Sequence, residues 1–183
     1  MEESDGKLLL ELARKSITYY FSKDRDIDLT PYKKFDKEQG VFVTLNKKSQ
    51  LRGCIGFPYP TQKLYKAVFD AARSAAFEDP RFPRLEDSEL DDIDIEISVL
   101  TVPELLECEP EERPEHINIG KDGLIMKGAQ GSGLLLPQVF TEYKCTPERA
   151  LEMTCQKAGL PDDAWKDKST EVLRFQAQIF KEI

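Results

Sequence analysis

Residues 40–56 read GVFVTLNKKSQLRGCIG, and this stretch predicts two strands joined by a tight turn. Apolar and polar side chains alternate in its first half, the polar run 47–50 reverses the chain, and residues 51–56 return as the partner strand. Because successive side chains of a strand point to opposite faces, Arg52 and Cys54 are expected to share a face. The stretch therefore predicts a β-hairpin that presents a cation and a thiol together.

Cys54 is the first candidate for chemistry in this hairpin. Glycine inside a strand marks a bulge or a close backbone approach, and Cys54 has Gly53 before it and Gly56 two residues after it. A nearby cation such as Arg52 is expected to lower the pKa of a thiol and to favour the reactive thiolate. The alternative is that a small cysteine packs in the interior, because free cysteines are among the most buried residues. The sequence leaves both interpretations open.

Regular patterns on either side of the hairpin predict further elements. Apolar residues at helical spacing predict an N-terminal helix over about residues 7–21 and a second helix over about 62–78. The strict alternation of residues 91–101 predicts the clearest strand. The remaining predicted elements are strands at 117–119, 124–126, 134–136 and 171–180, a helix at 137–143, and a helix capped by Thr146 that runs from 147 to about 159.

Hairpins joined by helices predict an α+β fold with a largely antiparallel sheet flanked by helices. The length of 183 residues suits one domain spanning 1–183, with or without a small subdomain, and with a core of about 40–180 on which the N-terminal helix packs. A chain of this size buries roughly 70% of its unfolded surface, so it needs no disulfides for stability.

The charge is unevenly distributed along the chain. Residues 85–115 contain 13 acidic residues and one arginine, whereas the net charge of the whole chain is −8. This balance argues against nonspecific nucleic-acid binding, which depends on neutralising phosphates. The role of the acidic segment stays open between a solvated surface and an interface. The absence of a signal-like or membrane-spanning apolar run predicts a cytoplasmic protein.

The residues that bind metals or phosphates in other proteins do not form known patterns here. The four cysteines include no CxxC pair, so a zinc site is not expected. We expect all four cysteines to be free thiols. Asp92, Asp94 and Glu96 share a strand face, but residues two apart lie roughly 7 Å from each other, so a solvated face, or one paired with Lys or Arg on a neighbouring strand, is favoured over a cation site. The glycine-rich residues 128–133 predict a hairpin turn. Nothing in the sequence indicates a cofactor or metal.

Several motifs, in order, resemble the AMMECR-type domain family, which is named after a chromosomal deletion region. Residues 51–56 resemble the family's hallmark, and residues 76–83 (AFEDPRFP) resemble the motif after its first core helix. The alternating run 93–100 is similar to the family's strand at this point. The stretches LLPQV at 135–139 and TCQKAGL at 154–160 resemble its microbial branch.

This resemblance covers roughly residues 40–180 and implies a fold and partners, but no reaction. It implies an α+β fold with a curled, barrel-like sheet, described either as two repeats or as a large and a small subdomain. It also implies association with Memo-like and radical-SAM proteins as one component of a shared system. Some members carry a histidine where Asp122 stands in this chain, so a catalytic role for that histidine cannot be transferred.

Two functions of different classes remain open. In one, the chain is a thiol-dependent enzyme that uses Cys54 as nucleophile or redox group on an anionic small molecule. In the other, it is a noncatalytic component that docks a partner protein around residues 51–56. The candidate catalytic residues are Cys54 and Asp79, and the candidate ligand-binding residues are Arg52, Gly53, Gly56, Glu78 and Arg81.

The second function is favoured, because one chain supplies no complete catalytic set. The only histidine, His116, follows an acidic, proline-rich connection and is expected on the surface, which disfavours a Cys–His pair. We expect action together with other proteins, no membrane association, and an oligomeric state that the sequence leaves open.

Overall fold

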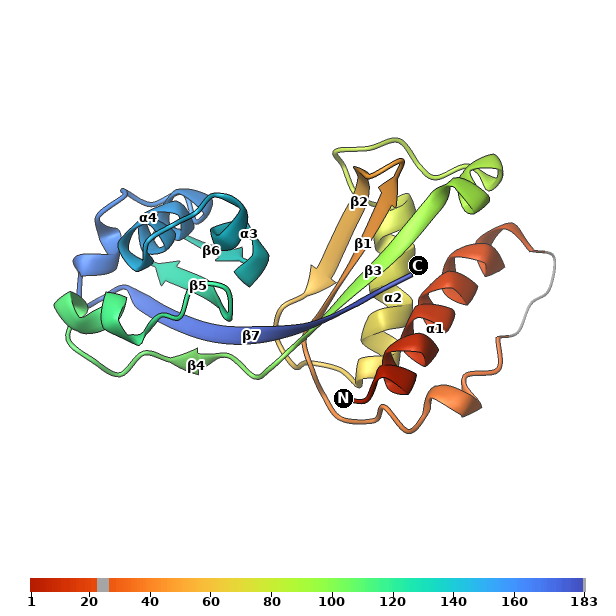
Figure 1. The fold of residues 1–183 in the computed structure, drawn as a ribbon, viewed down its shortest axis with the longest axis horizontal. Coiled ribbons are helices and arrows are strands. Elements are labelled where there is room, and N and C mark those ends of the chain that lie inside the picture. Colours follow the sequence, from red (N-terminus) through yellow and green to blue (C-terminus); the bar gives the residue numbers. More distant parts are fainter. Residues whose placement is uncertain (23–26, 183) are drawn as a thin grey trace. The chain divides into compact units, whose positions relative to one another are not determined.

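The computed structural model describes residues 1–22 and 27–182 (Figure 1). Its α-helices are α1 (Glu3–Phe21), α2 (Leu64–Phe77), α3 (Pro137–Glu142) and α4 (Pro147–Lys157). Its strands are β1 (Val41–Lys47), β2 (Gln50–Phe57), β3 (Ile93–Leu100), β4 (Glu104–Leu105), β5 (Asp122–Gly128), β6 (Gly131–Leu135) and β7 (Glu171–Lys181). Its short 3-10 helices are η1 (Thr30–Tyr32), η2 (Asp87–Asp92), η3 (Pro110–His116) and η4 (Ala164–Lys166). Each strand pairing with a determined register is antiparallel, and the predicted α+β class is confirmed.

The chain forms two compact units. The first comprises residues 1–100 together with the C-terminal residues from Gln178, and the second comprises residues 101–177. Each unit has its own cluster of buried apolar side chains. The long strand β7 contributes its first residues to the second unit and its last residues to the first.

The first unit contains a sheet whose strands lie in the order β2, β1, β3 and the end of β7. The helices α1 and α2 cover one face of this sheet (Figure 1). Its core lies between this face and the helices, because the apolar residues of β1 and β3 alternate with polar ones as predicted. The small side chains of α2 let the helix approach the sheet closely. The buried residues of these elements include Val41, Val43, Leu45, Ile95, Ile97, Val68, Ala71, Ala72 and Ala75.

The predicted hairpin is confirmed as β1 and β2. Lys48 and Ser49 form its two-residue turn with positive φ values of 52° and 62°, as the right-handed twist of paired strands favours. Leu45 faces Gly53 whereas Asn46 faces Leu51, so Arg52 has no partner residue on β1. This bulge interrupts the strict alternation from which a shared face for Arg52 and Cys54 was expected.

The second unit contains β6, β5 and β7 in this order, with β4 also paired to β7. α4 packs against β5 and β6, where a Cβ on Gly131 would lie 2.2 Å from the carbonyl oxygen of Ala158. Thr146 caps α4 as predicted, because its side chain accepts a hydrogen bond from the backbone N–H of Arg149 at 3.3 Å. The core centres on Phe140 and Leu151.

Several predicted strands have other bounds than expected: β3 begins at Ile93 instead of residue 91, so Asp92 lies in η2 and not on the strand, and β5 and β6 begin at Asp122 and Gly131 instead of residues 124 and 134. Three further differences have a cause in the contacts. α1 begins at Glu3 instead of residue 7, because the backbone N–H of Glu2 already bonds to the Asp5 carboxylate at 3.3 Å. α2 begins at Leu64 instead of residue 62, because Lys63 is held extended by a bridge to Glu38. Residues 117–119 form no strand, since the backbone N–H of Asn118 donates to Asp122 and the chain turns there. No helix in the described part of the chain is long and apolar enough to cross a membrane.

Candidate functional site

The two motifs that stood out in the sequence meet at the outer edge of β2. Residues 78–84, called the strap below, follow α2 and lie beside β2. Pro80 and Pro83 of the strap have no backbone N–H, so these positions cannot donate to β2 as a strand would. The strap is therefore attached to β2 by side chains, and the site consists of these two segments.

Asp79 joins the strap to Cys54. Its side chain is only 2% exposed, and its Oδ2 accepts hydrogen bonds from the backbone N–H of Cys54 at 2.9 Å and from Arg81 Nη2 at 2.7 Å. Arg81 Nε donates to Oδ1 of the same carboxylate at 2.9 Å. These bonds, above all those from Arg81, hold the pKa of Asp79 well below its ordinary range, although burial opposes them. The carboxylate is therefore a permanently charged anchor.

Arg81 is oriented by this anchor. Its Nη2 also donates to the carbonyl oxygen of Cys54 at 3.1 Å, while 54% of its side chain stays exposed. The hydrogen bonds to the Asp79 carboxylate are the largest cause that raises the pKa of Arg81 above its ordinary value. The guanidinium is thus held in one orientation at the surface, where it can accept an anionic group.

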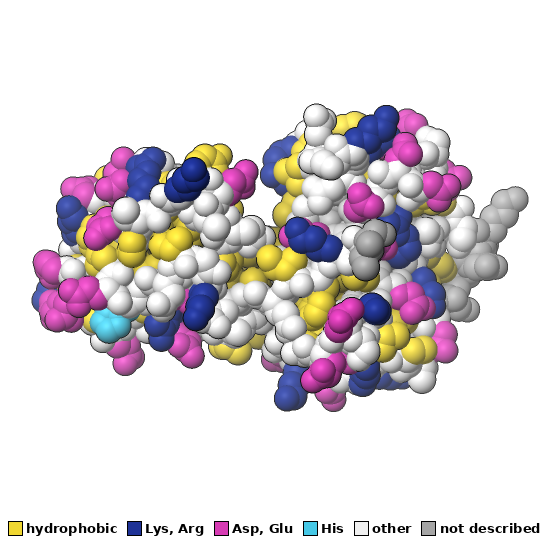
Figure 2. All heavy atoms as spheres, viewed as in Figure 1, with side chains coloured by type: hydrophobic (Ala, Val, Ile, Leu, Met, Phe, Trp, Pro, Cys, Tyr) yellow, Lys and Arg dark blue, Asp and Glu magenta, His cyan; other side chains and the backbone are white. Residues whose placement is uncertain are grey.

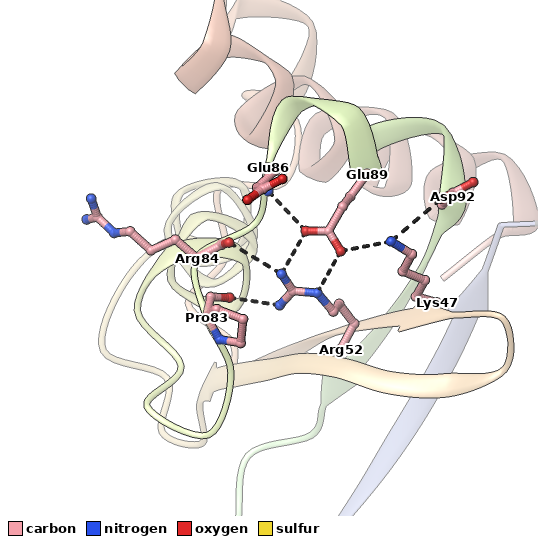
Figure 3. Close-up of polar contacts among 7 residues, drawn as sticks. All are labelled: Lys47, Arg52, Pro83, Arg84, Glu86, Glu89 and Asp92. Carbon is pink, nitrogen blue, oxygen red and sulfur yellow. Dashed lines mark hydrogen bonds and ion pairs between the residues drawn. The ribbon is translucent and has the colours of Figure 1, made fainter.

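Arg52 belongs to a separate network (Figure 3). Its Nε and Nη2 donate to the two carboxylate oxygens of Glu89 at 3.1 and 2.8 Å, and its Nη1 donates to the carbonyl oxygen of Pro83 at 2.9 Å. Lys47 Nζ lies 3.0 Å from the same carboxylate. The hydrogen bonds from Arg52 are the largest cause that lowers the pKa of Glu89 to about 2. Because only 12% of the Arg52 side chain is exposed, Arg52 connects β2, the strap and η2 instead of offering an open anion site.

The thiol of Cys54 is half-buried, and it accepts a hydrogen bond from the Thr44 hydroxyl at 3.3 Å. Thr44 lies directly opposite on β1, where the two side chains of an antiparallel pair come close. The only histidine of the chain, His116, belongs to the second unit and is exposed on the surface, where Figure 2 shows a histidine in cyan. The first unit therefore contains no histidine that could act as a base for Cys54.

The other candidate residues have different surroundings. A Cβ on Gly53 would lie 2.2 Å from the carbonyl oxygen of Ala75, so this glycine allows α2 to pack on β2. A Cβ on Gly56 would lie 2.3 Å from the carbonyl oxygen of Val41. Glu78 is exposed and accepts a hydrogen bond from the Ser74 hydroxyl at 2.7 Å. The structure thus brings Asp79 and Arg81 to Cys54, but it does not bring Arg52 or Glu78 to the thiol.

Sequence reasoning missed Thr44 and Glu89. Glu89 lies in an acidic run in which no local feature distinguishes one carboxylate from the next. The spacing of Glu86 and Glu89 was a usable signal, because it is that of a helix-capping pair, and the N–H of Glu86 does donate to Glu89 at 3.1 Å. Thr44 could not be found by pairing the two predicted strands from their turn outward, because without the bulge at Arg52 this places Thr44 opposite Gly53 instead of Cys54.

Two of the three carboxylates considered for a cation, Asp92 and Glu96, are paired with lysines. Asp92 lies 3.6 Å from Lys47 Nζ, and Glu96 lies 2.7 Å from Lys181 Nζ. Within residues 1–22 and 27–182, no group of three His, Cys, Asp or Glu side chains is arranged to hold a metal ion. Pairing with lysines therefore accounts for Asp92 and Glu96, and Asp94 is an exposed residue of β3.

Comparisons with known proteins agree over nearly the whole chain. The family model named AMMECR1 matches residues 10–180. A protein of Thermococcus onnurineus is 51% identical over 185 residues, which cover 97% of this chain and 90% of that protein. Protein PYRAB00100 of Pyrococcus abyssi is 49% identical with the same coverage. The crystal structure of uncharacterized protein PH0010 from Pyrococcus horikoshii has a TM-score of 0.91 and 46% identity, covering 100% of this chain and 93% of that one.

Proposed function

This chain belongs to the AMMECR1 family, and from that premise we propose that it is a binding component of a multi-protein system. Its docking surface is β2 around Cys54 together with the strap. The proposed partners are Memo-like and radical-SAM proteins of the same cell, with which the resemblance associates the microbial branch.

The observation that carries this proposal is the fixed guanidinium of Arg81. A half-exposed arginine ordinarily loses side-chain freedom when it binds, and this loss weakens binding. The buried carboxylate of Asp79 has already restricted Arg81 through bonds at 2.7 and 2.9 Å, so less freedom remains to be lost. Among the described residues none accepts a hydrogen bond from Nη1 of Arg81, which leaves this nitrogen for a partner's carboxylate.

The surroundings of the thiol support binding more than catalysis. A nucleophilic cysteine needs a neighbouring base or another group that stabilises the thiolate. The hydroxyl that contacts Cys54, from Thr44, donates a hydrogen bond to the sulfur and is too weak a base to deprotonate it. The acidic group nearest in the network, Asp79, is occupied by the Cys54 N–H and by Arg81.

Binding experiments with a matched pair of arginine variants test the proposal. Purified Memo-like and radical-SAM proteins of the same organism are titrated against the wild type, Arg81→Ala and Arg149→Ala. Arg149 is the control, because its side chain is similarly exposed at 48% and lies in the second unit. We expect Arg81→Ala to weaken binding by about tenfold or more and Arg149→Ala to leave it unchanged. The proposal would be contradicted if the wild type and both variants bound the partners equally well, or if the wild type bound neither partner.

The alternative function, a thiol-dependent enzyme acting on an anionic small molecule, is favoured by one contact. Arg81 lies beside Cys54, where it could hold a substrate anion next to the sulfur. Alkylation of the four cysteines across a pH series, read by mass spectrometry, tests this reading, with the fully buried Cys155 as the slow reference. Labelling of Cys54 that is no faster than that of Cys155 would rule out the enzyme. Turnover that disappears in Cys54→Ser but persists in Cys145→Ser would establish it.

A further inference from the structure

β2 is an edge strand whose outer side is occupied by side chains. No other described strand pairs with it beyond β1. An uncovered edge presents unpaired N–H and C=O groups on which another chain can add a strand. The groups that cover the outer side of β2 therefore decide whether β2 can pair with a strand of another chain.

The backbone groups that point outward can be identified from the contacts. Both the N–H and the C=O of Cys54 bond to strap side chains, so they point away from β1. Because outward and inward residues alternate along an antiparallel strand, Gly56 also directs its N–H and C=O outward. The outer side of β2 thus carries hydrogen-bonding groups at Cys54 and, two residues further, at Gly56.

The side chains of Asp79 and Arg81, called the clamp below, replace a neighbouring strand at Cys54. The carboxylate accepts the bond from the N–H at 2.9 Å, and the guanidinium donates to the C=O at 3.1 Å. A residue of a paired strand would supply one acceptor and one donor in the same way. The clamp and an added strand therefore compete for the same two backbone groups.

We propose that the clamp is an edge guard that prevents β2 from pairing with β2 of a second copy of this chain. The edge is self-complementary, because an antiparallel pairing centred on Ile55 sets Cys54 of one copy opposite Gly56 of the other. Each such pair exchanges two hydrogen bonds. The two-fold arrangement therefore satisfies the outward N–H and C=O groups of Cys54 and Gly56 in both copies. Glycine and cysteine have small side chains, so the two strands can approach each other once the strap, which Arg52 also holds at Pro83, has moved aside. This inference does not depend on the proposed function.

Removal of the guard is the test, with Asp79→Ala as the variant. Loss of the carboxylate frees the N–H of Cys54 and releases Arg81, so we expect the Cys54 amide to exchange hydrogen about tenfold faster. We also expect the mass measured by light scattering to rise from monomer to dimer with concentration, while the wild type keeps its mass. A short bismaleimide should link Cys54 to Cys54 between copies, because diagonal neighbours across paired strands lie only about 7–8 Å apart.

Asp122→Ala is the matched control. Asp122 is also almost fully buried and also accepts a backbone N–H, from Asn118 at 2.9 Å, but it belongs to the second unit. This variant should lose stability without forming Cys54–Cys54 links. Fast exchange at Cys54 in Asp79→Ala with no change of mass would overturn the inference, and so would equal dimerisation of the Asp122 variant.

A second variant decides the matter if Asp79→Ala does not fold. Arg81→Ala keeps the bond from Cys54 N–H to Asp79 and frees only the carbonyl oxygen of Cys54. We expect it to dimerise through Cys54-linked edges at higher concentration than the Asp79 variant. A folded Arg81→Ala protein that stays monomeric at every concentration would then overturn the inference.

Discussion

At the scale of single residues, Asp79 determines the geometry around Cys54. Its carboxylate fixes the backbone of β2 on one side and the guanidinium of Arg81 on the other. The sequence singled out Cys54 and Asp79 as the candidate catalytic residues. The structure adds that the cation beside the hairpin edge is Arg81, because Arg52 is engaged by Glu89.

Glu89 should make the stability of the first unit depend on pH. Arg52, the largest cause, lowers the pKa of Glu89 from 4.5 to about 2. Because the pKa is lower in the folded state, the stabilisation is present above pH 4.5 and is lost as the pH falls towards 2. It is on the order of 2 to 3 kcal/mol, since one pKa unit corresponds to about 1.4 kcal/mol and the side chain is mostly buried.

Urea unfolding at several pH values measures this effect. We expect Glu89→Gln to be less stable than the wild type near pH 6 and to approach it near pH 2. Asp87→Asn is a suitable control, since this exposed residue of the same 3-10 helix has no ion pair among the described contacts. Parallel curves for the wild type and Glu89→Gln across the whole range would show that the predicted linkage is absent.

At the scale of elements, Gly53 sets the distance between α2 and β2. A methyl group there would lie 2.2 Å from the backbone oxygen of Ala75, so the helix or the strand has to move. We expect Gly53→Ala to lower the free energy of unfolding by about 1–3 kcal/mol or more, the usual cost of overpacking. Denaturant unfolding measures this cost. Cys54→Ala is the control on the same strand, and a Gly53→Ala protein as stable as this control would refute the contact.

The elements themselves were largely predictable from periodic patterns. Alternation identified β1 and β3, helical spacing identified the buried side of α2, and Thr146 marked the start of α4. Errors arose where a side chain competed with the backbone, as Asp122 does when it takes the N–H of Asn118. The bulge at Arg52 was also out of reach, because it depends on the register between two strands and not on either strand alone.

At the scale of the whole molecule, the C-terminal residues complete the first unit. Glu182 accepts hydrogen bonds from Arg14 Nε at 3.1 Å and from the N–H of Ile95 at 2.8 Å, and its own N–H donates to the carbonyl oxygen of Ile95 at 3.0 Å. These contacts join α1, β3 and the residue that follows β7. No local pattern near residue 182 indicates them, which is why the sequence did not predict them.

We expect Glu182→Ala to destabilise the first unit by about 2 kcal/mol, because Arg14 loses a mostly buried carboxylate and the N–H of Ile95 loses its acceptor. Hydrogen exchange of β3 amides should speed up, above all at Ile95. Glu104→Ala is the control, since this carboxylate is 72% exposed and lies 3.6 Å from Arg174. Unchanged exchange at Ile95 would contradict the expectation.

The passage of β7 through both units has a consequence for the order of events on the ribosome. The second unit is encoded by the uninterrupted stretch 101–177, so all of its residues become available together during translation. The first unit starts to emerge earlier but waits for the residues from Gln178, which pair with β3. Until those residues leave the exit tunnel, the outer edge of β3 has no partner strand and presents unpaired backbone groups. The part made first is therefore the part finished last.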